Sequence, residues 1–430
     1  MSDRKKVIIV GSGAGGAAAA LELADVYDVT ILEAGKEFHP FSASIDTWAS
    51  LRKTGLFLDE RMIRLLLPNM QVRKSESMIM VNGIGVGGTT PLATGNAVRS
   101  DQALKELGID LDEQFDKLYE TLPITRDHQQ YWNPATRELF RIFEEMGLDP
   151  QATPKFLKKS RCANCGHCAI GCPANIKWDT RDMISQAVEK GARLITGCKV
   201  KKFLIHDGEV TGLVAVQGLR EVTYQADLYL LAAGGFGTPV ILENSGIPCP
   251  KSLFVDPVLC VAAVRKDFRQ DRQLLMPFYS QQDGYMLSPY LDYLSFFFDK
   301  KWRYPKGDMV SLMIKMADDN RGSSEPRAIH KKLTEMDKKR LKNGVIQCRE
   351  ILGRMGISRE DTFLGILNAG HPGGMLPLTP ESKDSLHDSR LPGNLYAADA
   401  SLFPRSAGLP PILTIMALSM KVAQTIVENG

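Results

Sequence analysis

The sequence predicts an α/β protein in which a parallel sheet with helices is interrupted by a smaller α+β domain with an antiparallel sheet. Residues Lys6 to Val10 form an apolar, β-branched run, and a helix-favouring AAAALELA stretch follows after several glycines. A second run, Asp28 to Leu32, completes a strand, turn, helix and strand, which is typical of a parallel sheet. Two later runs, Leu228 to Ala233 and Leu395 to Ala398, indicate that this sheet draws strands from both ends of the chain.

The interrupting domain is expected at about residues 256–365. Candidate strands there are Leu259 to Val264 and Met309 to Met316, and the charged stretch KKLTEMDKKRLK predicts the solvated face of a helix. The aromatic segment Tyr290 to Trp302 fits an apolar pocket lining or a docking surface, and fits a buried strand at least as well. We therefore expect a discontinuous nucleotide-binding domain at 1–255 and 366–430, a substrate or cap domain at 256–365, and a cysteine-rich insert at about 155–180.

Composition narrows the class of protein. The chain has 430 residues, a formal net charge of +3 and 44% hydrophobic residues, which excludes a disordered chain and gives no electrostatic reason to expect nucleic acid. No apolar run approaches the roughly 18–20 residues of a membrane span. The N-terminus runs directly into the first strand and leaves no room for a signal peptide, so a cytoplasmic location is expected.

Three glycines after the first strand form the pattern G-x-G-x-x-G. Gly11 permits the tight turn, Gly13 lets the backbone approach a pyrophosphate, and Gly16 allows close packing of helix on strand. Glu33 follows 22 residues after Gly11, at the end of the second strand, where its carboxylate can accept hydrogen bonds from ribose hydroxyls. The strand, helix and acidic residue together predict a Rossmann-like dinucleotide site, and Glu33 disfavours a 2′-phosphate and hence NADP.

Four further segments resemble the glucose-methanol-choline oxidoreductases, in the order found in that family. They are VNGIGVGGTTPLATGNAVR (81–99), LLAAGGFGTPVILENSGI (230–247), NAGHPGGM (368–375) and GNLYAADASLFPRSAGLPPILTIMALSMKVAQTI (393–426). The resemblance covers about 1–255 and 366–430. It implies bound FAD and oxidation of a small-molecule substrate at a CH–OH bond.

The resemblance also implies which residues bind the FAD. The pyrophosphate would lie at the glycine turn, the ribose at Glu33, the isoalloxazine beside Gly88, and the adenine against the backbone of Val200. Pro411 would begin the last helix, whose dipole would point at the flavin and stabilise its anionic reduced form. The expected cofactor-binding residues are Gly11, Ser12, Gly13, Ala14, Gly15, Gly16, Glu33, Ala34, Gly87, Gly88, Thr89, Asn96, Val200, Ala233, Gly234, Asp399, Ala400, Pro411 and Ile412.

His371, within the HPGG motif, is the expected catalytic base. In the family's reaction an imidazole accepts the alcohol proton while hydride leaves the same carbon for flavin N5, which suits a group that titrates near neutral pH. A lone histidine is more often structural, but this motif favours catalysis. Two departures matter: Pro410 stands where the family usually has a second polar residue, His or Asn, and Ala93 stands where many relatives have Asn, with Asn96 three residues later.

A cysteine run, CANCGHCAIGCP, has the spacing C-x₂-C-x₂-C-x₃-C-P of bacterial ferredoxins. It predicts a [4Fe-4S] cluster held by Cys162, Cys165, Cys168 and Cys172. In two-cluster ferredoxins the fourth cysteine ligates the other cluster, so a distant thiol could replace Cys172; the candidates are Cys198, Cys249, Cys260 and Cys348. A zinc site, or no metal at all, are the alternatives.

Together these features predict a dehydrogenase whose electrons leave FAD singly, through the cluster, to an external carrier such as a ferredoxin, a cytochrome or a partner subunit. An oxidase has no need of such an exit. Two other functions stay open: a reductase of a carbonyl or activated double bond, which Pro410 keeps possible, and a non-enzymatic electron-transfer subunit. The region 256–365 is short for the family, which suggests an open or partner-completed substrate pocket.

Overall fold

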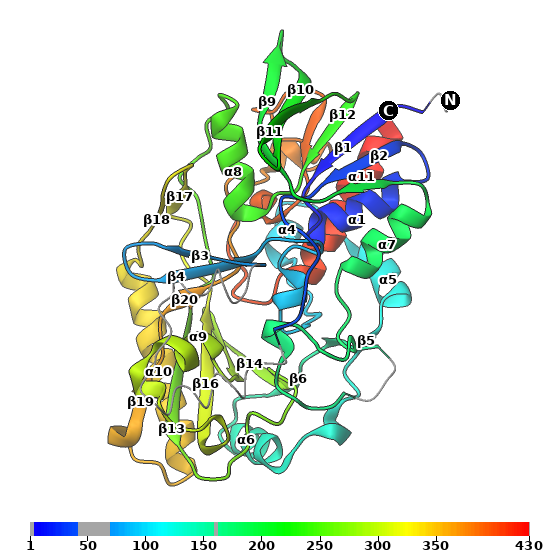
Figure 1. The fold of residues 1–430 in the computed structure, drawn as a ribbon. Helices are drawn as coiled ribbons and strands as arrows, with labels where there is room; N and C mark the ends of the chain where they lie inside the picture. The colour runs from blue at the N-terminus through cyan, green and yellow to red at the C-terminus, as the bar shows by residue number, and fades with distance from the viewer. Residues whose placement is uncertain (1–3, 42–68, 159–161, 430) are drawn as a thin grey trace.

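The structure is a computed structural model that describes residues 4–41, 69–158 and 162–429, and it is built on two sheets (Figure 1). The first is a five-stranded parallel sheet, as predicted. In spatial order its strands are β21 (Leu395–Ala397), β12 (Leu228–Leu231), β1 (Lys6–Val10), β2 (Asp28–Leu32) and β8 (Arg193–Ile195). The predicted runs account for four of these strands; β8 carries no comparable signal.

Helices cover this sheet. The alanine-rich α1 (Ala14–Leu23) lies beside the C-terminal α11 (Ile412–Asn429) under the strands, because its small side chains allow a close approach. Next to this pair lie α7 (Arg181–Glu189) and α5 (Asp112–Thr121). The other elements of this half are α4 (Gln102–Lys105), α8 (Gly234–Asn244), and the antiparallel strands β9 (Cys198–His206), β10 (Glu209–Gln217) and β11 (Arg220–Tyr224).

The second sheet has nine strands and is largely antiparallel. In spatial order they are β3 (Met70–Lys74), β4 (Ile79–Gly83), β20 (Asn368–Ala369), β13 (Val258–Val264), β16 (Met309–Met316), β15 (Tyr285–Pro289), β14 (Phe278–Gln282) and β6 (Gln151–Ala152), with β19 (Thr362–Leu364) also on β13. It thus recruits β3, β4, β6 and β20 from outside 256–365. Smaller pairs are β5 (Ile124–Thr125) with β7 (Lys155–Phe156), and β17 (Gly322–Ser324) with β18 (Ile329–Lys331).

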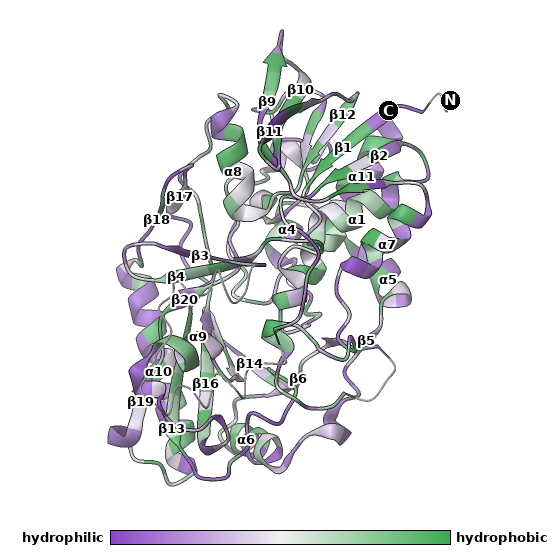
Figure 2. Cartoon of the chain, viewed as in Figure 1, coloured by the Kyte–Doolittle hydropathy of each residue, from purple (hydrophilic) through white to green (hydrophobic). Residues whose placement is uncertain are grey.

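The two faces of this second sheet bury different layers. Side chains that alternate along β13 and β16 pack on one face against α6 (Pro134–Glu145) and α10 (Glu335–Arg354), and on the other against α9 (Tyr293–Phe298) and the cysteine run. Figure 2 shows hydrophobic strands within both halves and hydrophilic residues along α10. Part of the charged stretch therefore forms the solvated face of a helix, as predicted. The helix α10 begins only at Glu335, after a capping box made by Thr334 and Asp337, and the first residue of the stretch, Lys331, is buried in β18.

The strand interpretation of the aromatic segment 290–302 is wrong. The strand β15 ends at Pro289, and Asp292 caps α9 by accepting a hydrogen bond from Leu294 N at 3.0 Å. Because this local cap starts a helix, the aromatic rings gather on one helical turn instead of alternating. Among the described residues, no helix is long and apolar enough to cross a membrane.

Candidate active site

A cavity of about 430 Å³ lies at the carboxyl ends of the strands of the parallel sheet. Most of the predicted cofactor-binding residues line it. They are Gly11, Ser12, Gly13, Ala14, Gly15, Glu33, Ala34, Gly88, Thr89, Val200, Ala233, Gly234, Asp399, Ala400, Pro411 and Ile412. Three others stand back from it. Gly16 packs α1 on the turn, since a Cβ there would lie 2.0 Å from Gly11 O; Gly87 packs against Arg181 and Pro91; and Asn96 lines a different cavity.

The local geometry of this nucleotide cavity fits a pyrophosphate. The helices α1 and α8 both begin at it, and neither N-cap residue forms a side-chain cap. The first N–H groups of α1 can therefore serve an anion, whereas the first N–H of α8, that of Gly234, donates to Asp399. Gly11 has φ +104° and a Cβ would lie 2.3 Å from Ala232 O, whereas a Cβ on Gly13 would meet nothing closer than Gly88 Cα at 3.8 Å. Gly11 therefore serves the turn, and Gly13 keeps open space beside the helix N-terminus.

Two buried carboxylates brace the nucleotide cavity. Glu33 accepts hydrogen bonds from Ser12 N at 3.0 Å and Ser12 Oγ at 2.6 Å. Asp399 accepts from Gly234 N at 2.8 Å and Thr238 Oγ1 at 2.6 Å, and its burial raises its pKa despite these donors. These contacts connect the ends of β2 and β21 to the starts of α1 and α8.

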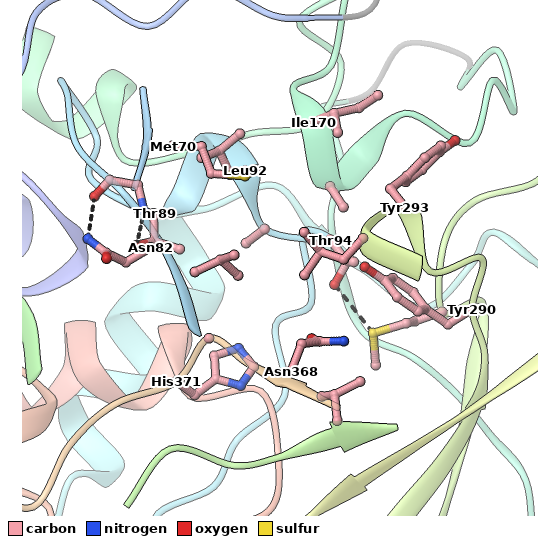
Figure 3. Close-up of a pocket in the computed structure, with 18 of the residues that line it drawn as sticks. Met70, Asn82, Thr89, Leu92, Thr94, Ile170, Tyr290, Tyr293, Asn368 and His371 are labelled. Carbon is pink, nitrogen blue, oxygen red and sulfur yellow. Dashed lines mark hydrogen bonds between the residues drawn. The ribbon is translucent and has the colours of Figure 1, made fainter. Parts of the chain in front are cut away.

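A second cavity of about 180 Å³ adjoins the first and is mainly apolar (Figure 3). We call it the substrate cavity. The helix α9 supplies Tyr293, Leu294, Phe297 and Phe298, and Tyr290 precedes them, so the aromatic segment lines a pocket. The residues that line both cavities are Asn82, Gly83, Thr89, Ala93, Gly370, His371 and Ile412.

His371 lies at this junction. Figure 3 shows its imidazole directed into the substrate cavity near Asn368. Its Nδ1 is buried without a hydrogen-bond partner and lies 3.8 Å from Asp256 Oδ2. Loss of hydration in this apolar surrounding, together with the nearby positive charge of Lys315, lowers the pKa of His371 well below 6.5. The imidazole is therefore neutral at physiological pH and able to accept a proton.

Sequence reasoning missed three polar residues near His371. Asn368 lines the substrate cavity and belongs to the NAGHPGGM motif, which could have pointed to it. Lys315, from β16, also lines the cavity, and Asp256 lies behind it; neither belongs to any motif. The two form an ion pair with only 1% and 2% of their side chains exposed.

The four cysteines of the run line one further cavity, of about 80 Å³, which we call the cysteine cavity. The backbone folds around it with positive φ at Asn164 (49°), Gly166 (71°) and Gly171 (98°). All four thiols are free, and burial raises the pKa of Cys162 to about 11. Within the described residues, no three His, Cys, Asp or Glu side chains stand close enough to hold a metal ion, so the predicted cluster stays a prediction. Of the alternative thiols, Cys198, Cys249, Cys260 and Cys348 are not among the lining residues.

Two buried lysines also line the cysteine cavity. Lys155 and Lys177 are 1% and 4% exposed, and in the described part of the chain neither forms an ion pair with a carboxylate. Lys155 Nζ donates to Asn96 Oδ1 and to Leu275 O at 2.6 Å. Lys177 Nζ donates to Thr90 O at 2.9 Å and Pro91 O at 3.0 Å. Desolvation lowers the pKa of both lysines, that of Lys155 to about 7.

One segment separates the substrate and cysteine cavities. Thr94 lines both of them, and the carbonyls that receive Lys177 belong to the same stretch, 90–96. This stretch directly follows Thr89, which lines the nucleotide cavity. The stretch 90–96 therefore lies between the cysteine cavity and the substrate cavity, and it begins next to a residue of the nucleotide cavity.

Comparison with known proteins identifies the family and the fold. A sequence model of GMC oxidoreductases matches residues 6–258. An uncharacterized protein of Methanocaldococcus jannaschii is 28% identical over 97% of this chain and 98% of its own length. The long-chain-alcohol oxidase FAO1 of Arabidopsis thaliana is 22% identical over 98% of this chain and 66% of its own. The crystal structure of pyridoxine 4-oxidase from Mesorbium loti superposes with a TM-score of 0.72 at 17% identity, covering 99% of both chains.

Proposed function

Because this chain belongs to the GMC oxidoreductase family, and is thus an FAD-dependent oxidoreductase that acts on alcohols, we propose that it dehydrogenates an apolar alcohol with His371 as base. One observation carries the proposal. His371 lies where the nucleotide cavity meets the substrate cavity, so a substrate at its imidazole would also face the flavin position.

Bound FAD would supply the hydride acceptor, flavin N5. The protein would do the rest. The aromatic and aliphatic wall would exclude water from the substrate, and His371 Nε2 would accept the hydroxyl proton as the C–H bond breaks. A neutral imidazole is required for this step, and the lowered pKa of His371 keeps it neutral well below pH 6.5.

The lining of the substrate cavity indicates the substrate class. Apart from Lys315, His371 and a few amide and hydroxyl groups, it consists of side chains such as Met70, Leu92 and Phe297. Such a surface recovers free energy by burying hydrocarbon and offers few partners to a polyol. The name of the Arabidopsis relative, a long-chain-alcohol oxidase, points in the same direction.

Anaerobic stopped-flow reduction of the FAD-loaded protein tests this function. We expect primary aliphatic or aromatic alcohols to bleach the flavin absorbance, with kcat/KM rising as methylene groups are added. Glycerol and glucose should reduce it far more slowly. Faster reduction by the polyols would refute the apolar substrate, and reduction by no alcohol would refute the function itself.

We also propose that the cysteine cavity holds an iron–sulfur cluster ligated by Cys162, Cys165, Cys168 and Cys172. Four thiols that share one cavity, two buried lysines that form no ion pair with a carboxylate in the described part of the chain, and a segment that this cavity shares with the substrate cavity support it. A bound cluster would supply a one-electron exit to an external carrier, which makes the protein a dehydrogenase. The thiols would lose their protons on binding metal.

Metal and sulfide analysis of protein purified without oxygen distinguishes an iron–sulfur cluster from a zinc site. Iron and acid-labile sulfide near four each per chain, with an EPR signal after dithionite reduction, are expected. One zinc per chain and no iron would establish a structural site instead. Absence of both metals, after reconstitution with iron and sulfide has also failed, would remove the electron exit from the proposal.

A further inference from the structure

Asp256 occupies a strained and fully engaged position behind His371. Its backbone has φ +51°, in the left-handed region, which non-glycine residues hold only where the surroundings fix them. The carboxylate accepts from Lys315 Nζ on Oδ2 and from Ser406 Oγ on Oδ1, and its own N–H donates to Asp318 Oδ1 at 2.8 Å. The chain therefore holds a carboxylate near Nδ1 of His371, the ring nitrogen that is buried without a hydrogen-bond partner among the described residues.

Lys315 contacts the same carboxylate oxygen, Oδ2, that lies near His371, and it also lines the substrate cavity. Its Nζ donates to Leu409 O at 3.0 Å, so the ammonium sits beside the residue that precedes Pro410. Pro410 is the position at which the sequence lacks the expected second polar residue. A charged donor thus lies near the place where the motif offers none.

We propose that Asp256, Lys315 and His371 act as one unit in which Asp256 orients the imidazole and Lys315 binds the substrate oxygen. This inference rests on the proposed alcohol oxidation. Asp256 accepts a hydrogen bond from His371 Nδ1–H, which leaves Nε2 unprotonated for the hydroxyl proton. The present 3.8 Å separation exceeds a hydrogen bond, and such contacts commonly tighten when substrate binds.

The charges of Lys315 and Asp256 are opposite to those that develop on the substrate oxygen and on the imidazole during the reaction. As the hydroxyl proton moves to Nε2, negative charge grows on the substrate oxygen and positive charge on the imidazole. Lys315 donates a hydrogen bond to the former, and Asp256 stabilises the latter. The carboxylate and the ammonium neutralise each other before substrate arrives, which makes their burial tolerable.

Kinetics of flavin reduction test the roles separately. Lys315→Met should lower the rate constant about 10²–10³-fold, as loss of one charge-stabilising donor does. The pH at which the rate falls should also rise toward 6.5, because desolvation still lowers the pKa of His371 but the second cause, the positive charge of Lys315, is gone. The titratable groups that face the ring are Asp256 and Lys315, with Asp318 behind Asp256. The double variant Lys315→Met/Asp256→Asn removes both charges together and guards against misfolding from one unpaired charge.

A nearby ion pair provides the matched control. Lys331 pairs with Asp318 at 2.6 Å, both with 0% side-chain exposure, and neither lines the substrate cavity. Lys331→Met should destabilise the fold comparably, and because it removes no charge that lines the substrate cavity, it should change the rate and pH profile of flavin reduction much less than Lys315→Met does. Wild-type rate and pH profile in both Lys315 variants would overturn the role of Lys315.

A spectroscopic readout makes the inference independent of turnover. In the FAD-loaded protein with ¹⁵N-labelled histidine, the nitrogen shifts should report His371 as the Nδ1–H tautomer, and Asp256→Asn should abolish that preference. An Nε2–H tautomer in the wild type would overturn the role of Asp256, even if alcohols do reduce the flavin. If no alcohol reduces it but the Nδ1–H tautomer is present, the alcohol function fails while the orienting contact stands.

Discussion

The substrate cavity and the cysteine cavity lie on opposite sides of the segment 90–96, and each contains buried lysine. In the substrate cavity the ammonium of Lys315 meets a carboxylate, Asp256. In the cysteine cavity, within the described residues, the hydrogen bonds of Lys155 and Lys177 go to carbonyl and amide oxygens. The lysine of the first cavity is thus paired with a carboxylate, whereas the lysines of the second are desolvated without an ion pair in the described part of the chain. The carboxylate of Asp179 favours the charged form of Lys177 only from a longer distance. This difference supports the proposal that the second cavity takes an anionic guest, such as cysteine thiolates around a metal centre.

The energetic scale supports this distinction. An ion taken out of water costs several kcal/mol even after the protein relaxes, and a well-placed opposite charge offsets much of that cost. Neutral hydrogen-bond acceptors, as around Lys155, offset less of it. Desolvation that is not fully offset therefore lowers the pKa of Lys155 to about 7.

Replacing His371 should produce the largest effect on the rate of flavin reduction and should leave the iron content of the cysteine cavity unchanged. Loss of the proton acceptor in His371→Ala is expected to slow flavin reduction by about 10²–10⁴-fold, the usual contribution of a general base. Stopped-flow bleaching measures it. His330→Ala is the control, because this imidazole is 55% exposed and its ion-pair partner among the described residues is Glu325. A loss of iron in His371→Ala would show that the two cavities are not independent sites.

Replacing Cys165 should affect the cysteine cavity and spare the substrate cavity. In Cys165→Ala the iron content should fall and turnover with a one-electron acceptor should drop, while single-turnover flavin reduction by alcohol persists. The control is Cys348→Ala, since this buried thiol of α10 lines none of the nucleotide, substrate and cysteine cavities. Unchanged iron content in Cys165→Ala would remove this thiol from the ligand set.

The two cavities also differ in how far the sequence predicts them. The glycine turn and the cysteine run are determined by residues that are close in the sequence. The backbone of Gly11, with φ +104°, requires a residue without Cβ, and the cysteine spacing can be recognised directly in the sequence. Likewise β1, β2 and β16 are continuous apolar runs, and their bounds are as predicted. Such features can be predicted because neighbouring residues in the sequence determine them.

Features made by tertiary pairing are not visible in this way. Asp256 and Lys315 are 59 residues apart and meet only because β13 and β16 are neighbours. The strand β20 pairs with β4, far away in the chain, which places Asn368 beside the substrate cavity. The aromatic segment misled for a related reason, since composition favours a strand but the single cap at Asp292 starts a helix.

Replacing Lys155 should produce the smallest effect, a change in how the free energy of unfolding depends on pH. This change is specific to the cysteine cavity. In metal-free protein the folded state binds fewer protons than the unfolded chain between the lowered pKa, about 7, and the ordinary 10.5, so the free energy of unfolding should rise with pH across that window. Thermal melts from about pH 7 to 9 should show this rise in the wild type and a weaker one in Lys155→Met, where Lys177 still contributes. Bound cluster should flatten the wild-type curve, because neighbouring thiolates favour the charged lysine and return its pKa toward the ordinary value. If the wild-type slope were the same with and without iron and sulfide, Lys155 would not sense the cavity's guest, and the contrast between the two cavities would lose its electrostatic basis.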